Sequence, residues 1–176
     1  MEWEDYKKFI VWKDTIVRCD ITPLFENPKV FHNLVEDMIR PFRKKSIDKV
    51  IALDALGFVL GSAVAYKLKK PLVLVRKGGK FPLKKSKLIW RDFVDYTKTK
   101  KRLEIKKSSI NNGERVLIID EWIDTGTQIE NVIKLVEKLK GKIVGISSIN
   151  MKPSKKTKTL MNKYYIHTLR VQPEKK

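Results

Sequence analysis

Two carboxylates, Asp120 and Glu121, directly follow the apolar run of residues 116–119. Such a run is typical of a buried strand, and burying carboxylates at its end costs free energy unless something pairs with them. The hydroxyl groups of a sugar would satisfy these acids, and so would a hydrated Mg²⁺ ion. The residue types alone leave both ligands open.

A loop rich in hydroxyl groups comes next and leads into a predicted helix at 128–140. Its residues are Asp124, Thr125, Gly126, Thr127 and Gln128. The first turn of a helix has unpaired N–H groups and a positive dipole end, and Gly126 allows close approach of a ligand to the backbone. These properties indicate a phosphate site. The alternative is a simple helix cap, in which Asp124 or Thr125 satisfies only the backbone.

Hydrophobic periodicity predicts the elements that must position these groups. Strands are expected at 49–53, 71–76, 115–120, 142–149 and 164–171. Helices are expected at 27–45, 57–69 and 128–140, the first capped by Asn27 and ended or kinked by Pro41. A long loop is expected at 77–92, a hairpin or ribbon at 93–107 and a solvated basic loop at 151–158. Strands that alternate with helices predict an α/β fold, in which helices flank a parallel sheet.

Polar residues mark the ends of three predicted strands. Asp54 follows the first, Arg76 and Lys77 the second, and Asp120 and Glu121 the third. In parallel sheets flanked by helices, ligands bind at the carboxyl ends of the strands. We therefore expect these side chains to converge on one site.

Composition limits the function classes. The 176 residues suit one domain, 1–176, and include 39 Lys and Arg against 20 Asp and Glu, a net charge of +19. This charge fits either a solubilising surface or a polyanion partner. We favour the surface, and expect no nucleic acid partner, because the basic residues are spread along the chain. The single cysteine, Cys19, suits a cytoplasmic protein, and no apolar window is long enough to span a membrane.

The stretch VLIIDEWIDTGTQ, residues 116–128, resembles the phosphoribosyl diphosphate (PRPP) signature of the type I phosphoribosyltransferases. Four further segments resemble adenine phosphoribosyltransferases in order and spacing. They are CDITPLFENPKVF (19–31), DKVIALDALGFVLGSAVA (48–65), LVRKGGKFP (74–82) and DYTKTKKRLEI (95–105). The resemblance covers roughly residues 15–150.

This resemblance implies a purine salvage enzyme that joins adenine to PRPP and releases AMP and pyrophosphate. It also implies Mg²⁺ bound through PRPP rather than directly by the protein, and a homodimer. In fold it implies a small hood, from about 1–26 and 93–107, and a mobile loop at about 77–92.

The resemblance also implies roles for single residues. The ribose-binding residues would be Asp120 and Glu121, and the 5′-phosphate would lie on residues 124–128. The pyrophosphate-binding residues would be Asp54, Ala55, Arg76, Lys77 and Lys80. The base-binding residues would be Val17, Arg18, Cys19 and Trp122. Two carboxylates remain candidates for the catalytic acid/base group, Asp95 in the hood and Asp124 in the phosphate loop.

Several positions depart from the adenine pattern. Leu56 stands where the family has an arginine, and Glu121 where it has an aspartate. Asp124 gives the phosphate loop a likeness to the hypoxanthine-guanine enzymes, and Arg18 and Trp122 occupy the base-stacking positions. A 6-oxopurine is therefore an alternative substrate. A catalytically weak protein that senses PRPP or nucleotides is a second alternative, and an electrostatic RNA or DNA binder a third.

Overall fold

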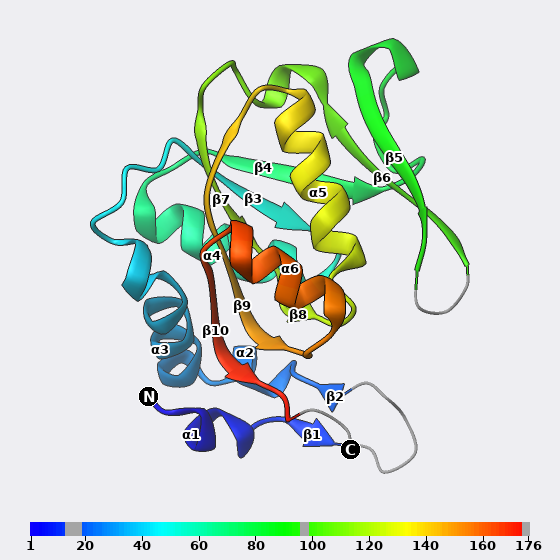
Figure 1. The fold of residues 1–176 in the computed structure, drawn as a ribbon. Coiled ribbons are helices and arrows are strands. Elements are labelled where there is room, and N and C mark those ends of the chain that lie inside the picture. The colour runs from blue at the N-terminus through cyan, green and yellow to red at the C-terminus, as the bar shows by residue number, and fades with distance from the viewer. Residues whose placement is uncertain (13–18, 96–98, 174–176) are drawn as a thin grey trace.

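The computed structural model describes residues 1–12, 19–95 and 99–173 (Figure 1). Its α-helices are α1 (Trp3–Lys7), α2 (Pro23–Glu26), α3 (Pro28–Ile39), α4 (Leu56–Leu68), α5 (Thr127–Lys138) and α6 (Lys155–Lys163). Short 3₁₀ turns lie at Arg40–Phe42, Lys85–Lys87 and Lys107–Ser109. The first five strands are β1 (Val11–Trp12), β2 (Cys19–Asp20), β3 (Lys49–Leu53), β4 (Leu72–Lys77) and β5 (Leu88–Val94). The others are β6 (Lys100–Lys106), β7 (Arg115–Ile119), β8 (Trp122–Ile123), β9 (Lys142–Met151) and β10 (Ile166–Val171).

The main sheet has the strand order β10-β9-β7-β3-β4-β6-β5, and β8 adds to β9. Strands β10, β9, β7, β3 and β4 are parallel to one another, whereas β6 pairs antiparallel with both β4 and β5. The parallel sheet predicted from the alternation of strands and helices is confirmed. Because β4, β3 and β7 are neighbours, their carboxyl ends lie at one edge.

Two hydrophobic clusters fill the space on the two faces of the sheet. One cluster packs the apolar side of α5, together with Leu160 of α6, against the sheet. The other packs α3, α4 and the N-terminal elements against the opposite face. In Figure 1, α5 and α6 lie in front of the strands, and α1, β1 and β2 lie below them. The sheet is thus covered on both faces, as a mainly parallel sheet requires.

Helix α3 begins where its sequence predicts. The Asn27 side chain accepts hydrogen bonds from the backbone N–H groups of Lys29 and Val30, and Pro28 occupies the first helical position. The α-helix ends at Ile39, earlier than the predicted residue 45, because Pro41 cannot continue it and the chain turns in a 3₁₀ helix.

The loop expected at 77–92 is shorter than predicted. A 3₁₀ turn occupies Lys85–Lys87, and strand β5 starts at Leu88. The predicted hairpin is present, but it spans β5 and β6 and therefore begins before residue 93. Strand β5 was missed because its apolar residues do not alternate in the sequence. The consecutive apolar residues 88–90 precede Arg91 and Asp92, although burial alternates from Ile89 to Val94.

The prediction of a basic loop at 151–158 is also wrong, because α6 starts at Lys155. Ser154 caps this helix by accepting a hydrogen bond from the Thr157 N–H group, and the Thr157 side chain reaches back to the Ser154 backbone. Thr157 and Leu160 are buried beneath the helix. Lysines hid this short amphipathic pattern, because they occupy half of the exposed positions of the helix.

The N-terminal helix is fixed to α3 by a buried hydrogen bond. The Tyr6 hydroxyl donates to Asp37 Oδ2 over 2.5 Å, and Arg40 pairs with the same carboxylate. Burial and the neighbouring Asp37 carboxylate raise the pKa of Tyr6 well above its usual value, so the hydroxyl stays protonated and donates. This contact holds α1 on the same side of the sheet as α3.

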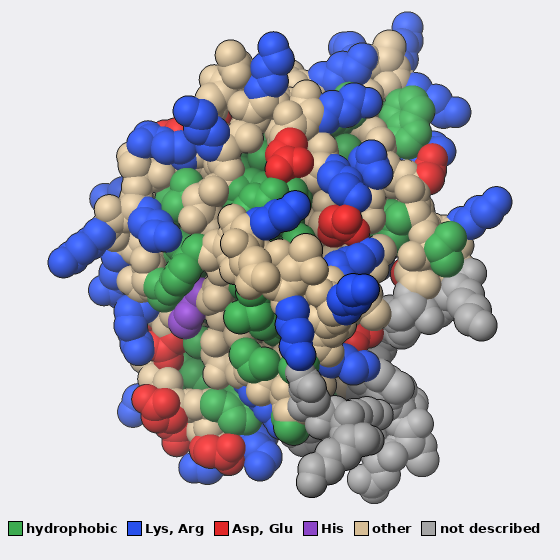
Figure 2. Space-filling model, in the orientation of Figure 1, with side chains coloured by type: hydrophobic (Ala, Val, Ile, Leu, Met, Phe, Trp, Pro, Cys, Tyr) green, Lys and Arg blue, Asp and Glu red, His purple; other side chains and the backbone are tan. Residues whose placement is uncertain are grey.

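Lys and Arg side chains are spread around the face shown in Figure 2 and do not gather on one element. This distribution agrees with a solubilising surface. Within the described ranges, no helix is both long and apolar enough to cross a membrane.

Helix α4 approaches β3 closely at Gly61, where an added Cβ atom would lie 2.4 Å from the Cβ of Ala52. We expect Gly61→Ala to lower the free energy of unfolding by about 1–3 kcal/mol, because overpacking outweighs the gain in helix propensity. Urea denaturation measures this change. Ser62→Ala, at an exposed position of the same helix, is the control. Equal stability of the two variants would show that the contact with Ala52 relaxes freely.

Candidate functional site

The carboxyl ends of β3, β4 and β7 place their polar residues together. Asp54 follows β3, Lys77 ends β4 and Asp120 follows β7. The Lys77 N–H group lies 3.5 Å from Asp54 Oδ2, and the Lys77 ammonium is close enough to affect the titration of Asp120. The structure therefore brings together the three groups that the strand ends predict.

Asp120 is buried, with only 2% of its surface exposed. Its Oδ1 accepts a hydrogen bond of 3.0 Å from the Glu121 N–H group. Burial and then the neighbouring Glu121 carboxylate raise the pKa of Asp120 well above its usual value, and Lys77 offsets part of this rise. Gly57 at the start of α4 leaves the carboxylate its space, since a Cβ atom there would lie 3.2 Å from Asp120 Oδ1.

Glu121 has a carboxylate oxygen for which the described part of the chain offers no hydrogen-bond partner. Its Oε2 is buried and accepts no hydrogen bond from the described residues. The Glu121 carbonyl oxygen accepts from the N–H groups of Ile149 and Asn150, so β9 fixes the backbone at this position. A buried acceptor without a donor is costly, and a ligand hydroxyl would remove that cost.

The hydroxyl loop forms the N-terminus of α5. Gly126 has φ +80°, in the left-handed region that favours glycine, and it is the N-cap residue, with no side chain to cap the helix. The Thr125 hydroxyl lies 3.1 Å from the Thr127 hydroxyl and accepts only a long 3.4 Å hydrogen bond from the Thr127 N–H group. This arrangement favours an anion cradle over a simple side-chain cap.

A C-terminal segment that sequence reasoning missed contacts this loop directly. Lys152 Nζ lies 3.2 Å from Asp124 Oδ1, and the Ser154 hydroxyl donates to the Thr125 carbonyl oxygen over 3.1 Å. A Cβ atom on Gly126 would lie 3.0 Å from Thr157 Cγ2. The Ser154–Thr157 capping box was the available sequence signal, because it marks the start of α6.

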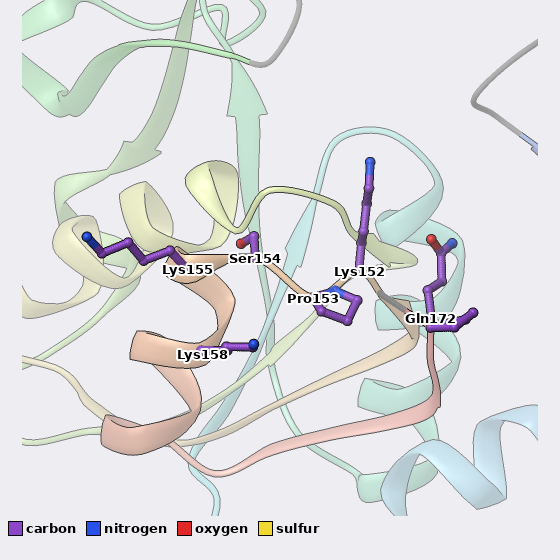
Figure 3. A pocket seen from close by; sticks show the side chains of 7 residues that line it. Lys152, Pro153, Ser154, Lys155, Lys158 and Gln172 are labelled. Carbon is purple, nitrogen blue, oxygen red and sulfur yellow. The ribbon is translucent and has the colours of Figure 1, made fainter. Parts of the chain in front are cut away.

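Beside this segment lies an open hollow of about 320 Å³ (Figure 3). Its lining residues are Lys152, Pro153, Ser154, Lys155, Lys158, Gln172 and Pro173. In Figure 3 the Ser154 hydroxyl points toward the turn that enters α5, whereas Lys155 extends away from Pro153. Ser154 therefore faces the hydroxyl loop, whereas Lys155 lies on a different surface of the same segment.

The predicted pyrophosphate residues form a connected group at the end of β4. Lys80 Nζ lies 3.1 Å from Oδ2 of the buried Asp54, and Arg76 Nη1 donates to the Lys80 carbonyl oxygen over 2.8 Å. The Gly79 N–H group donates over 3.1 Å to Glu104, a buried carboxylate that sequence reasoning did not single out. These contacts hold the turn 78–80 against the sheet.

The start of α4 contains the position where the family arginine is replaced. Ala55 is exposed, and the peptide bond between Asp54 and Ala55 is cis. Leu56 is half-buried and packs against the same hydrophobic cluster as Trp122. Leu56 thus makes an apolar contact at the position where the family has an arginine.

The predicted base-binding residues are only partly described. Val17 and Arg18 lie outside the described residues. Cys19 and Trp122 are half-buried and pack against the same cluster, and burial raises the pKa of the Cys19 thiol. Asn150 pairs with Trp122 in the β8–β9 register and is fully buried, and neither amide atom has a partner among the described residues. Sequence reasoning missed Asn150, which lies one residue beyond the end of the strand predicted at 142–149.

The two candidate acid/base groups are both engaged. Asp95 directly follows β5, and its Oδ1 accepts hydrogen bonds from the N–H group and hydroxyl of Thr99, while Lys101 Nζ lies 3.8 Å from Oδ2. Asp124 is paired with Lys152. Within the described part of the chain, no group of three or more His, Cys, Asp or Glu side chains is placed to hold a metal ion.

Comparisons with known proteins give one family. Residues 24–173 match the phosphoribosyl transferase domain. The adenine phosphoribosyltransferase of Roseobacter denitrificans is 37% identical over 148 residues, which are 83% of this chain and 82% of that protein. The Thermotoga petrophila enzyme of the same name is 37% identical over 159 residues, 88% of each chain. The crystal structure of adenine phosphoribosyltransferase from Rhodothermus marinus superposes with a TM-score of 0.87 and 30% identity, over 97% of this chain and 98% of that one.

The raised pKa of Asp120 leads to a prediction about stability. Between the pKa of an unfolded aspartate, about 4, and the higher folded value, the unfolded chain loses a proton that the folded chain retains. Stability is therefore lost as the pH rises through this range. We expect Asp120→Asn to raise the melting temperature by a few degrees at pH 7 and by less at pH 4. Thermal denaturation at both pH values checks this, and a variant that melts lower at pH 7 would contradict the burial argument.

Proposed function

This chain belongs to the phosphoribosyl transferase domain family, and we propose that it transfers the phosphoribosyl group of PRPP to adenine, giving AMP and pyrophosphate. The observation that carries the proposal is the buried acid pair Asp120–Glu121 beside the hydroxyl loop of α5. The Glu121 oxygen that has no donor among the described residues and the adjacent buried Asp120 match a ribose diol, and the helix N-terminus matches its 5′-phosphate.

The ribose would lie over the end of β7. We assign its hydroxyl groups to the buried Asp120 and to Glu121, whose buried Oε2 has no donor among the described residues. The longer side chain of Glu121 keeps the charge of the usual aspartate and changes its reach. The 5′-phosphate would accept hydrogen bonds from the first turn of α5 and from Thr125 and Thr127, with Asp124 and Gln128 bordering the loop.

Pyrophosphate would leave toward the turn after β4. As the bond between C1′ and the diphosphate oxygen breaks, positive charge develops on the sugar and the leaving group takes the electron pair. Arg76, Lys77 and Lys80 offer positive charge to that group, and the pair of Lys80 with Asp54 would open to admit it. We propose that Mg²⁺ enters with PRPP, held by PRPP oxygens, and adds charge neutralisation.

The base would lie near Trp122 and Cys19. A ring nitrogen of adenine attacks C1′, and the proton that it loses passes to Asp124 or to Asp95. The relatives named as adenine phosphoribosyltransferases favour adenine over the 6-oxopurine that the Asp124 loop suggested. With its single cysteine, the chain suits a reducing cytosol, where we place this salvage reaction.

A homodimer is supported by an apolar surface on α4. Tyr66 is 88% exposed and Val59, two turns earlier, is 41% exposed. Large apolar side chains that share a helix face in this way are typical of a protein contact.

Pyrophosphate release from PRPP and Mg²⁺ tests the proposed reaction directly. We expect release that depends on adenine, with little from hypoxanthine, guanine or xanthine at matched concentrations. Turnover of guanine alone would replace adenine by a 6-oxopurine. PRPP binding without release for any base would indicate a sensor, for which the packing of Leu56 in place of a cation is a reason.

The ribose assignment has its own test. We expect Asp120→Asn to lower kcat/KM for PRPP by roughly 10–100-fold, the effect of one lost hydrogen bond to a charged group. The same variant should keep its fold. Full activity would remove Asp120 from the ribose site.

The α4 surface predicts the oligomeric state. We expect Tyr66→Glu to shift the protein from dimer to monomer in sedimentation at micromolar concentration, because a charge replaces an apolar contact. Lys70→Gln, beyond the end of α4, lowers the net charge by the same amount and is the control for the change in charge. A dimer that survives the first change would place the interface elsewhere.

A further inference from the structure

Lys156 of α6 reaches across to the hydroxyl loop of α5. Its Nζ lies 3.1 Å from Thr127 Oγ1 and 2.8 Å from Glu130 Oε2. An ammonium group has three donors, and these two contacts use two of them. The side chain is 39% exposed, so the third donor is accessible beside the loop. We propose that Lys156 is a 5′-phosphate-binding residue, an inference that rests on the proposed function of this site.

The hydrogen bonds of the Thr127 hydroxyl indicate where a phosphate oxygen would lie. Thr127 Oγ1 accepts from Lys156 Nζ and from the Thr125 hydroxyl, each over 3.1 Å. With both lone pairs engaged, the hydroxyl proton of Thr127 must point to another acceptor. A phosphate oxygen that accepts this proton lies next to the Lys156 ammonium. Lys156 therefore orients one phosphate donor and supplies another.

The charges around the first turn of α5 require such a cation. Glu130 lies in that turn, and its carboxylate would repel a phosphate dianion. Lys134 Nζ, 2.7 Å away, and Lys156 both pair with Glu130, and they lower the pKa of its carboxyl, Lys134 first. Two ammonium groups thus surround one carboxylate, which leaves one positive charge for the phosphate.

The packing of α6 fixes this lysine in place. A Cβ atom added to Gly126 would lie 3.0 Å from Thr157 Cγ2, 3.3 Å from Leu160 Cδ1 and 3.5 Å from Lys156 Cγ, so these side chains lie close to the loop. Ser154 Oγ binds the Thr125 carbonyl oxygen from the same helix start. The Lys156 stem therefore rests on the loop backbone, so little side-chain freedom is lost when phosphate binds.

Calorimetric binding of AMP and of ribose 5-phosphate tests the proposal. We expect Lys156→Met to weaken both ligands roughly tenfold or more, because a charge-assisted hydrogen bond is lost, and Lys156→Arg to retain most of the affinity. Pyrophosphate binding should change less than about twofold, because that ligand occupies the other end of the site. Lys155→Met, an exposed neighbour on α6 without an ion pair among the described residues, should match the wild type.

The double variant Glu130→Gln/Lys156→Met distinguishes two roles of Lys156, direct binding of phosphate and neutralisation of the Glu130 carboxylate. If Lys156 binds phosphate, the double variant stays weak; if it only neutralises Glu130, affinity returns, which would overturn the proposal. Equal AMP affinity of Lys156→Met and Lys155→Met would overturn it as well. Failure of the proposed function has a different signature, since the wild type itself would then bind no AMP and release no pyrophosphate with adenine.

Discussion

A buried carboxylate at the end of the central strand is the constraint on which the rest depends. Asp120 is enclosed by β7, by Gly57 of α4 and by the Glu121 backbone, and its ionised form is disfavoured there. A sequence under selection only for stability would replace it with an apolar residue. We therefore infer that a bound ligand offsets the free-energy cost of burying this acid and the Glu121 oxygen that has no partner among the described residues.

The arrangement around this acid explains the shape of the fold nearby. Parallel neighbours β3, β4 and β7 deliver an acid, a lysine and an acid pair to one edge. The antiparallel β5–β6 ribbon extends the sheet beyond β4, and Glu104 of this ribbon holds Gly79 in the turn that carries Lys80. Positive groups therefore lie beside the buried acids, and a ligand whose hydroxyl groups lie between two negatively charged ends suits this edge of the sheet.

Sequence reasoning predicted the parallel sheet and the convergence of Asp54, Lys77 and Asp120, because both follow from strand periodicity and local order. It failed at β5 and α6. In β5 three apolar residues follow one another at 88–90, and in α6 lysines mask a short apolar face, so neither sequence shows a clear period. Contacts between distant segments, such as Lys156 with Thr127, arise from tertiary packing that a single sequence does not encode locally.

The position of α6 along the chain has a consequence for how the protein is made. The hydroxyl loop and α5 are synthesised well before α6 and β10, yet the loop backbone is held by Ser154 and packed by Thr157. A nascent chain that has emerged only as far as α5 has its acids and its glycine turn without the helix that supports them. On the proposed role of this loop, affinity for a phosphorylated ligand thus arises late in synthesis. Before that point substrate binding does not yet stabilise the unfinished chain, which is therefore more accessible to chaperones and proteases.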